Sequence, residues 1–259
     1  MKQYVLSLLL MLVFVPFAKG QKQVFLSLEG GPGIGLYRDL GTSPITYRGY
    51  EFAPCFALRY ESPKWQLSTT LGGFGGGYSY QPTLTSMQNY GGIPAFAISA
   101  LRRIVPQSPV RLWVGINVEE AIDIRYFPSL GNTSTSFSNF VNVNILGKAE
   151  YTLSHFLFQT QLTFAPASLC LRPGFAYLDN FNQDISNPVT NTFDQYEWYL
   201  TAFNQVSTSL AASYILPHGN RIGLSYRWHY LTSRTSALAP YRFEQANHAI
   251  LLTLDLLLN

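Results

Sequence analysis

The chain has 259 residues, of which 47% are hydrophobic, 15% are aromatic and only 12% are charged. A soluble domain carries roughly a quarter of its residues as Asp, Glu, Lys and Arg, so this composition argues against disorder and a coiled coil. The formal net charge of +3 includes Lys2 and Lys19, and the rest of the chain is almost neutral, so no nucleic-acid partner is implied. The mean hydropathy of +0.07 is too low for a bundle of membrane-spanning helices.

Residues 1–20 have the pattern of a signal peptide. Lys2 precedes an apolar stretch from Val5 to Ala18, and small residues precede Gln21 at the positions that signal peptidase requires. The alternative is an N-terminal anchor helix, but this stretch is short for a hydrocarbon core of about 30 Å. We therefore expect a cleaved leader, export from the cytoplasm, and a single mature domain over residues 21–259.

Beyond the leader, apolar and polar residues alternate with a period of two, which indicates β-strands. In residues 110–126, Val114, Ile116 and Val118 occupy one face, and Asn117 and Glu119 occupy the other. The same reading predicts about ten strands, with eight or twelve as alternatives. In chain order, the strands are predicted at 24–38, 47–61, 65–80, 92–104, 110–126, 139–153, 156–178, 196–216, 221–232 and 243–258.

The connections between these strands alternate in length. Short ones lie at 61–64, 106–109, 153–155 and 217–220, and longer polar ones are centred on 41–43, 81–89, 131–139, 180–195 and 232–240. Short periplasmic turns that alternate with longer external loops are typical of outer-membrane barrels. The predicted fold is therefore all-β, a transmembrane antiparallel up-and-down β-barrel, which pairs every backbone group in lipid.

Aromatic residues on the outward parity lie at both ends of the predicted strands, as the interfacial girdles of a barrel require. The predicted girdle residues are Tyr50, Tyr60, Trp65, Tyr126, Tyr151, Tyr214, Trp228 and Tyr230.

With these features, the chain resembles the small bacterial outer-membrane β-barrels, a broad class that includes OmpA-type domains, omptins and opacity proteins. The segment 224–230, followed by Ala246-Asn247-His248 and alternating leucines, is similar to the last hairpin of barrels common in Bacteroidota. The resemblance implies a Gram-negative outer membrane, with its bilayer and lipopolysaccharide as surroundings, a possible envelope protein partner and no cofactor.

Charged residues of both signs take the inward parity, which predicts an ion-pair network that fills a narrow lumen. The predicted network comprises Glu29, Glu51, Arg59, Glu119, Asp123, Arg125, Lys148, Glu150, Arg227, His229 and Asp255. Aqueous channels need about sixteen strands, so a general porin is disfavoured, and a narrow passive channel for small solutes stays open as an alternative.

The expected role is structural, accessory or surface-binding. The loop that spans residues 180–195 is the longest candidate platform for binding, with Phe181, Asp184, Phe193, Asp194 and the adjacent Tyr196. A second alternative is a lipid A or peptide hydrolase that uses a rim histidine, His229 or His248. No nucleophile has the spacing that a hydrolase needs and no metal-ligand cluster is present, so we expect no catalytic and no metal site.

Local irregularities are expected at four places. Glu120 is a charge on the outward face, and a bulge that turns it inward is favoured over a covering partner. Pro166 and Pro173 predict a local bulge in their strand, because proline cannot donate to the ladder. Glycines at 30–35 and 72–77 lie inside strands, where they allow bends and make room for large inward side chains. Cys55 and Cys170 lie half a barrel apart, too far for a disulfide.

Overall fold

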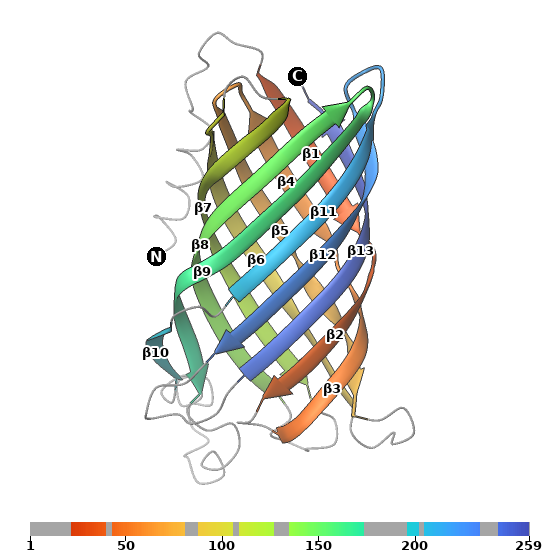
Figure 1. Ribbon diagram of the computed structural model, residues 1–259. Helices are drawn as coiled ribbons and strands as arrows, with labels where there is room; N and C mark the ends of the chain where they lie inside the picture. Colours follow the sequence, from red (N-terminus) through yellow and green to blue (C-terminus); the bar gives the residue numbers. More distant parts are fainter. Residues whose placement is uncertain are drawn as a thin grey trace.

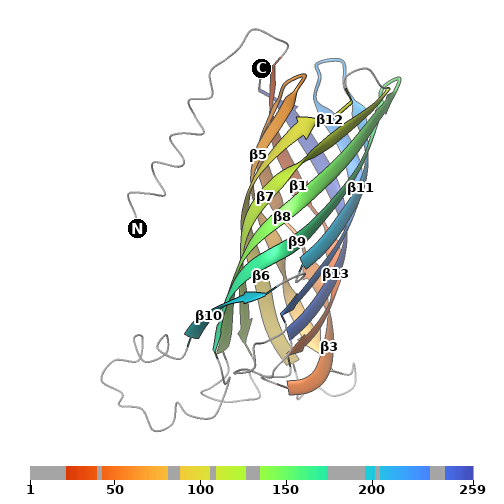
Figure 2. The same cartoon turned by 60° about the vertical axis from the view of Figure 1, so that its left-hand side comes forward.

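The structure, a computed structural model, describes residues 22–39, 43–80, 88–105, 109–126, 135–173, 196–201, 205–233 and 243–258. These residues form strands that are strongly tilted around a closed barrel (Figures 1 and 2). The strands are β1 (Gln23–Gly30), β2 (Pro32–Asp39), β3 (Ser43–Phe52), β4 (Cys55–Glu61), β5 (Trp65–Ser79), β6 (Gln88–Arg103), β7 (Val110–Tyr126), β8 (Thr135–Leu153), β9 (Phe156–Pro173), β10 (Tyr196–Thr201), β11 (Gln205–Ile215), β12 (Arg221–Ser233) and β13 (Phe243–Leu257). The predicted leader lies outside the described residues.

The thirteen strand segments of the described chain occupy ten positions around the barrel. β1 and β2 both pair with β13, β3 and β4 both pair with β5, and β10 and β11 both pair with β9, so each of these couples continues one spanning strand. All the pairings are antiparallel, and β13 meets β1 to close the ring. The sequence prediction of an up-and-down barrel with about ten strands is confirmed.

Two of the interruptions lie at a glycine and at a proline. Gly31 separates β1 from β2, and a side chain there would overlap the carbonyl group of Ile250 on β13. Pro54 lies between β3 and β4 and has no N–H to donate. The register of β9 against β8 shifts where Val143 pairs with Ala167 and Ile145 pairs with Phe164. This shift is the bulge expected at Pro166.

The strands extend further at the long-loop end than the sequence pattern indicates. β6 begins at Gln88 and β8 begins at Thr135, both four residues before their predicted starts. The long loop expected around Gly41 is wrong, because β2 ends at Asp39 and β3 begins at Ser43. These two strands stay paired to that point, with one irregularity beside Asp39, so three residues suffice to connect them.

Side chains alternate between the two faces of the wall. The outward face is apolar and exposed, with Leu224 and Ile250 as examples at 59% and 60% exposure. The inward face carries buried polar and aromatic side chains. An exposed apolar belt around a polar interior is the arrangement of a barrel in lipid. Among the described residues, no helix has the length and apolar character to cross a membrane.

Candidate functional site in the barrel lumen

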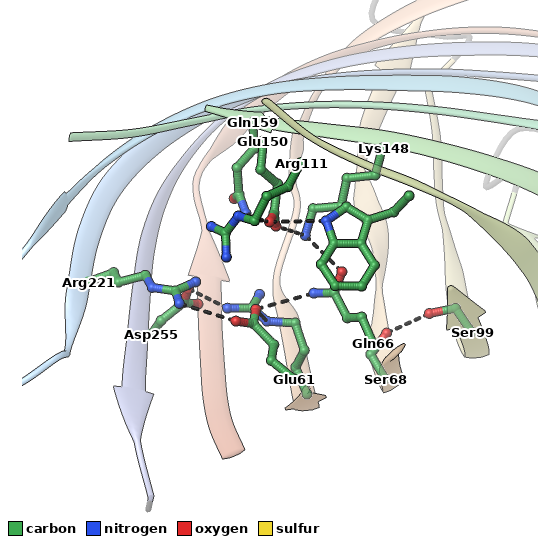
Figure 3. Close-up of polar contacts among 12 residues, drawn as sticks. Glu61, Gln66, Ser68, Ser99, Arg111, Lys148, Glu150, Gln159, Arg221 and Asp255 are labelled. Carbon is green, nitrogen blue, oxygen red and sulfur yellow. Dashed lines mark hydrogen bonds and ion pairs between the residues drawn. The ribbon is translucent and has the colours of Figure 1, made fainter. Parts of the chain in front are cut away.

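The inward side chains at the short-turn end form a network centred on Glu150 of β8 (Figure 3). Its Oε1 lies 2.7 Å from Lys148 Nζ, and its Oε2 lies 3.2 Å from Arg111 Nε. Trp113 Nε1 donates to Oε2 at 3.2 Å, and Gln159 Nε2 donates to Oε1 at 2.9 Å. Glu150 is 2% exposed, so one buried carboxylate connects β7, β8 and β9.

A second ionic cluster lies beside the first (Figure 3). Arg59 of β4 contacts Asp255 of β13 at 2.7 Å and Glu61 at 2.8 Å. Arg221 of β12 contacts the same two carboxylates, at 3.9 Å for Asp255 and 3.3 Å for Glu61. Two cations therefore share two anions, and the cluster joins strands that lie on both sides of the β1–β13 closure.

The middle of the lumen contains a cavity of about 270 Å³ with a mixed polar lining. Glu29 of β1 is ion-paired with Arg227 of β12 at its wall. Glu119 of β7 accepts a hydrogen bond of 2.9 Å from Gln205 Nε2 of β11. Gln205 Oε1 in turn accepts from Asn142. The predicted inward charges Glu29, Glu119 and Arg227 thus all line this cavity, with Glu29 paired to Arg227 and Glu119 bonded to Gln205.

Towards the long-loop end, the lumen is filled by aromatic side chains around Arg125. The guanidinium carbon of Arg125 lies 4.2 Å from the ring centre of Tyr37 and 4.7 Å from that of Tyr78. Arg125 Nε lies 2.8 Å from Asp123 Oδ1, and its Nη2 donates to Gln245 Oε1 at 2.7 Å. We call Arg125 and the buried aromatic residues around it the aromatic plug: Tyr37, Tyr47, Tyr78, Phe140 and Phe243.

Glu51 lies next to the plug, on its short-turn side. Its carboxylate accepts hydrogen bonds from Asn247 Nδ2 at 2.7 and 2.6 Å and from the hydroxyl of Tyr78. Gly35 faces this group, and a Cβ atom there would overlap the Glu51 carboxylate. The predicted role of the strand glycines, to make room for large inward side chains, holds at Gly35.

The sequence reasoning placed the charges on the inward parity but missed the aromatic plug. The available signal was Tyr37, which shares the odd parity of Glu29 along one spanning strand, as does Tyr47 with Glu51. The expectation of a polar interior led away from these two tyrosines as lumen residues. Asn247, Gln205 and Gln245, which complete the buried hydrogen bonds, were missed as well.

The two candidate rim histidines lie in different surroundings. His229 is 8% exposed and stacks on Phe74, with 5.8 Å between ring centres. His248 is exposed on the outward face, and its Nδ1 lies 2.6 Å from the hydroxyl of Tyr226. Among the described residues, neither imidazole has a hydrogen bond or ion pair with a carboxylate.

Glu120 does not turn inward, and the expected bulge is wrong. The pairing of β7 runs without a shift through Glu119 and Glu120 on both neighbouring strands. Glu120 is exposed on the outward face, where Asn139 Nδ2 donates to its Oε1 at 2.9 Å. This hydrogen bond from the neighbouring strand partly satisfies the carboxylate without any change of register.

The other predicted sites are placed only in part. The predicted girdle residues all have side chains on the outward parity, with Tyr50 at 82% exposure and Tyr60, Trp228 and Tyr230 half-buried. Of the candidate loop, Phe181, Asp184, Phe193 and Asp194 lie outside the described residues, as does the side chain of Tyr196. Cys55 and Cys170 are buried and not joined to each other. The described residues contain no cluster of metal-ligating side chains.

The sequence matches no protein-family model and no curated protein sequence. In three dimensions, the barrel is similar to the outer membrane protease OmpT from Escherichia coli, with a TM-score of 0.54 and 8% identity over 93% of this chain and 99% of that chain. Neisserial surface protein A matches with a TM-score of 0.37 and 11% identity over 89% of this chain and 95% of that chain. At 8% identity, the likeness to OmpT concerns the fold alone, which is that of a bacterial outer-membrane β-barrel. Together with the apolar outer belt, this fold places the protein in the outer membrane of a Gram-negative envelope.

Proposed function

We propose that the protein is a barrel with a filled lumen that serves the outer membrane as a structural, accessory or surface-binding component. The observation that carries this proposal is the position of Arg125. It is fully buried, lies against the rings of Tyr37 and Tyr78, and is bonded to both Asp123 and Gln245. A solute that entered from the long-loop end would have to displace a cation that is held on several sides.

The short-turn end supports the same proposal. The networks around Glu150 and Asp255 cross-link inward side chains of six strands, β4, β7, β8, β9, β12 and β13. Breaking one partner of a buried ion pair is costly, because the other charge stays buried without compensation. Both ends of the lumen therefore resist opening, and the outer wall remains for interactions with a partner.

The experiment is a single-channel recording of the purified protein in planar bilayers. The wild-type protein should show no steady openings, whereas a variant without the plug, Tyr37→Ala/Tyr78→Ala/Arg125→Ala, should conduct. Heat-modifiable mobility on a gel verifies that each preparation is folded. Steady wild-type openings would contradict the filled lumen. Affinity capture from detergent-solubilised membranes then tests the accessory role, for which a stoichiometric envelope protein is expected.

The cavity of about 270 Å³ is the one observation that favours the second candidate, a narrow passive channel. It has a mixed polar and apolar lining and lies between the two filled ends, so displacement of the plug would join it to the outside. In that case, the wild-type protein would show brief openings whose frequency rises in Arg125→Ala alone.

A catalytic role is not part of this proposal. His229 is covered by Phe74, and His248 faces outward against Tyr226. Incubation with labelled lipid A or a dibasic peptide should give no turnover. Turnover that is abolished in His229→Ala would contradict the non-catalytic role.

A further inference from the structure

The outer wall of the barrel is hollowed near the short-turn end by a groove of about 620 Å³. The deepest part of this groove is lined by short side chains on adjacent strands. Ala149 of β8 pairs with Thr160 of β9, and Ala212 of β11 pairs with Phe158 of β9. Larger outward side chains border these positions, among them Phe158, Leu210 and Tyr226. We call this feature the outer groove.

The outer groove opens sideways into the layer that surrounds the barrel. Its strands, β7 to β9 and β11 to β13, form one continuous wall (Figure 1). Its exposed neighbours are apolar, with Leu210 at 54% and Leu224 at 59% exposure. A hollow on this mostly apolar face is best filled by hydrocarbon, because its lining offers water few hydrogen-bonding partners and an empty space would forfeit van der Waals contacts.

Groups suited to a lipid headgroup lie at the short-turn end of the outer groove. Tyr151 and Tyr214 are each 40% exposed on the outward face, at the ends of β8 and β11. The ring of His155, in the turn between β8 and β9, lies 5.9 Å from that of Tyr214. Tyrosine hydroxyls and an imidazole donate hydrogen bonds to phosphate oxygens, and tyrosine is favoured at the height of the headgroups.

We propose that the outer groove binds one phospholipid of the periplasmic leaflet. An acyl chain lies over Ala149, Thr160 and Ala212, and the phosphate lies beside Tyr151 and Tyr214. We assign the lipid to the periplasmic leaflet because the outer groove lies near the short turns, and the short turns of an outer-membrane barrel face the periplasm. Lipid binding at this site does not depend on whether the lumen is filled, since all the side chains involved point outward.

The test is a titration of the detergent-purified protein with dimyristoyl phosphatidylglycerol, followed by native mass spectrometry. The wild-type protein should bind one lipid saturably. Ala212→Trp fills the outer groove and should weaken binding at least tenfold. Ala100→Trp is the matched control: Ala100 pairs with the exposed Ile116 and lies outside the outer groove, so binding should stay within twofold.

A second pair of variants examines the headgroup. Tyr151→Phe/Tyr214→Phe removes both hydroxyls but keeps the rings, and it should weaken binding severalfold. Tyr126→Phe, at the opposite end of the barrel, should have no effect. Equal binding by Ala212→Trp and Ala100→Trp would overturn the proposal, as would a second copy of the chain in place of the lipid. Displacement of the phospholipid by rough lipopolysaccharide would also overturn it, since that lipid belongs to the other leaflet.

Discussion

The guanidinium of Arg125 lies over the ring of Tyr37, with 4.2 Å between its central carbon and the ring centre. Tyr37 belongs to β2 and Arg125 to β7, so this contact spans the lumen rather than neighbouring strands. A buried cation is attracted by the partial negative charge on the faces of the aromatic rings. This attraction becomes stronger when water is excluded.

Arg125→Ala is expected to destabilise the folded barrel by about 3–5 kcal/mol, because the buried Asp123 carboxylate loses this cation. Urea unfolding in lipid vesicles measures the change. Arg102→Ala is the control, since Arg102 is exposed and lies 5.9 Å from the ring centre of Trp65. An equal loss in both variants would show that Arg125 contributes no more than a surface arginine.

Gly91→Ala should disturb the plug from beside Arg125. A Cβ atom at Gly91 would overlap Arg125 Cδ and the carbonyl oxygen of Ile124. Overpacking of this kind costs about 1–3 kcal/mol. Gly147→Ala is the matched control, because a Cβ atom there meets nothing within 4 Å. Thermal unfolding followed by gel mobility should separate the two, with Gly147→Ala at or slightly above the wild-type midpoint.

Glu150→Ala is expected to cost about 3–5 kcal/mol, because Lys148 and Arg111 then share no buried anion. Glu150→Gln keeps the volume and should retain the hydrogen bond from Trp113 while it loses the charge. The fluorescence of Trp113, isolated by Trp→Phe substitution of the other three tryptophans, reports the local change. Unaltered unfolding of Glu150→Ala would show that the network adds nothing to stability.

Glu120→Leu should stabilise the barrel in lipid by about 1 kcal/mol, because a carboxylate on the lipid face is costly. Vesicle-based unfolding gives the sign of the change. The same substitution on the inward neighbour, Glu119→Leu, is expected to destabilise, since Gln205 then loses its acceptor. If Glu120→Leu instead lowers the free energy of unfolding, a partner that covers this position is implied. A photocrosslinker at residue 120 would identify that partner.

Alternation along single strands was enough to predict the barrel, the approximate number of strands and the parity of Glu29, Arg59 and Asp255. It was not enough to predict partners. Arg227 and Glu29 are 198 residues apart and meet only because β12 and β1 flank β13. The contacts between inward side chains depend on strand register and tilt around the whole ring. Neither property can be predicted from the sequence of a single strand.

Two expectations show why the local pattern misleads. Glu120 was expected to turn inward because a charge that faces lipid is costly, yet it stays outward and accepts a hydrogen bond from Asn139 on the adjacent strand. The interior was expected to be polar throughout, yet tyrosine and phenylalanine side chains fill it at the loop end. These residues take the same inward parity as the charges. Parity reports the direction of a side chain, and only packing across the lumen decides which chemistry fits there.

The plug and the ring closure depend on each other during assembly. Gln245 and Asn247 of β13 bond to Arg125 of β7 and Glu51 of β3, and Phe243 packs on Tyr37 of β2. An open sheet that has not yet joined β1 to β13 therefore has none of these contacts and carries unpaired charges on the face that will become its interior. An intermediate with an open seam can still form the Glu150 network within β7, β8 and β9, but the contacts between the plug and β13 form only with the final strand pair, so closing the seam and completing the plug are one event.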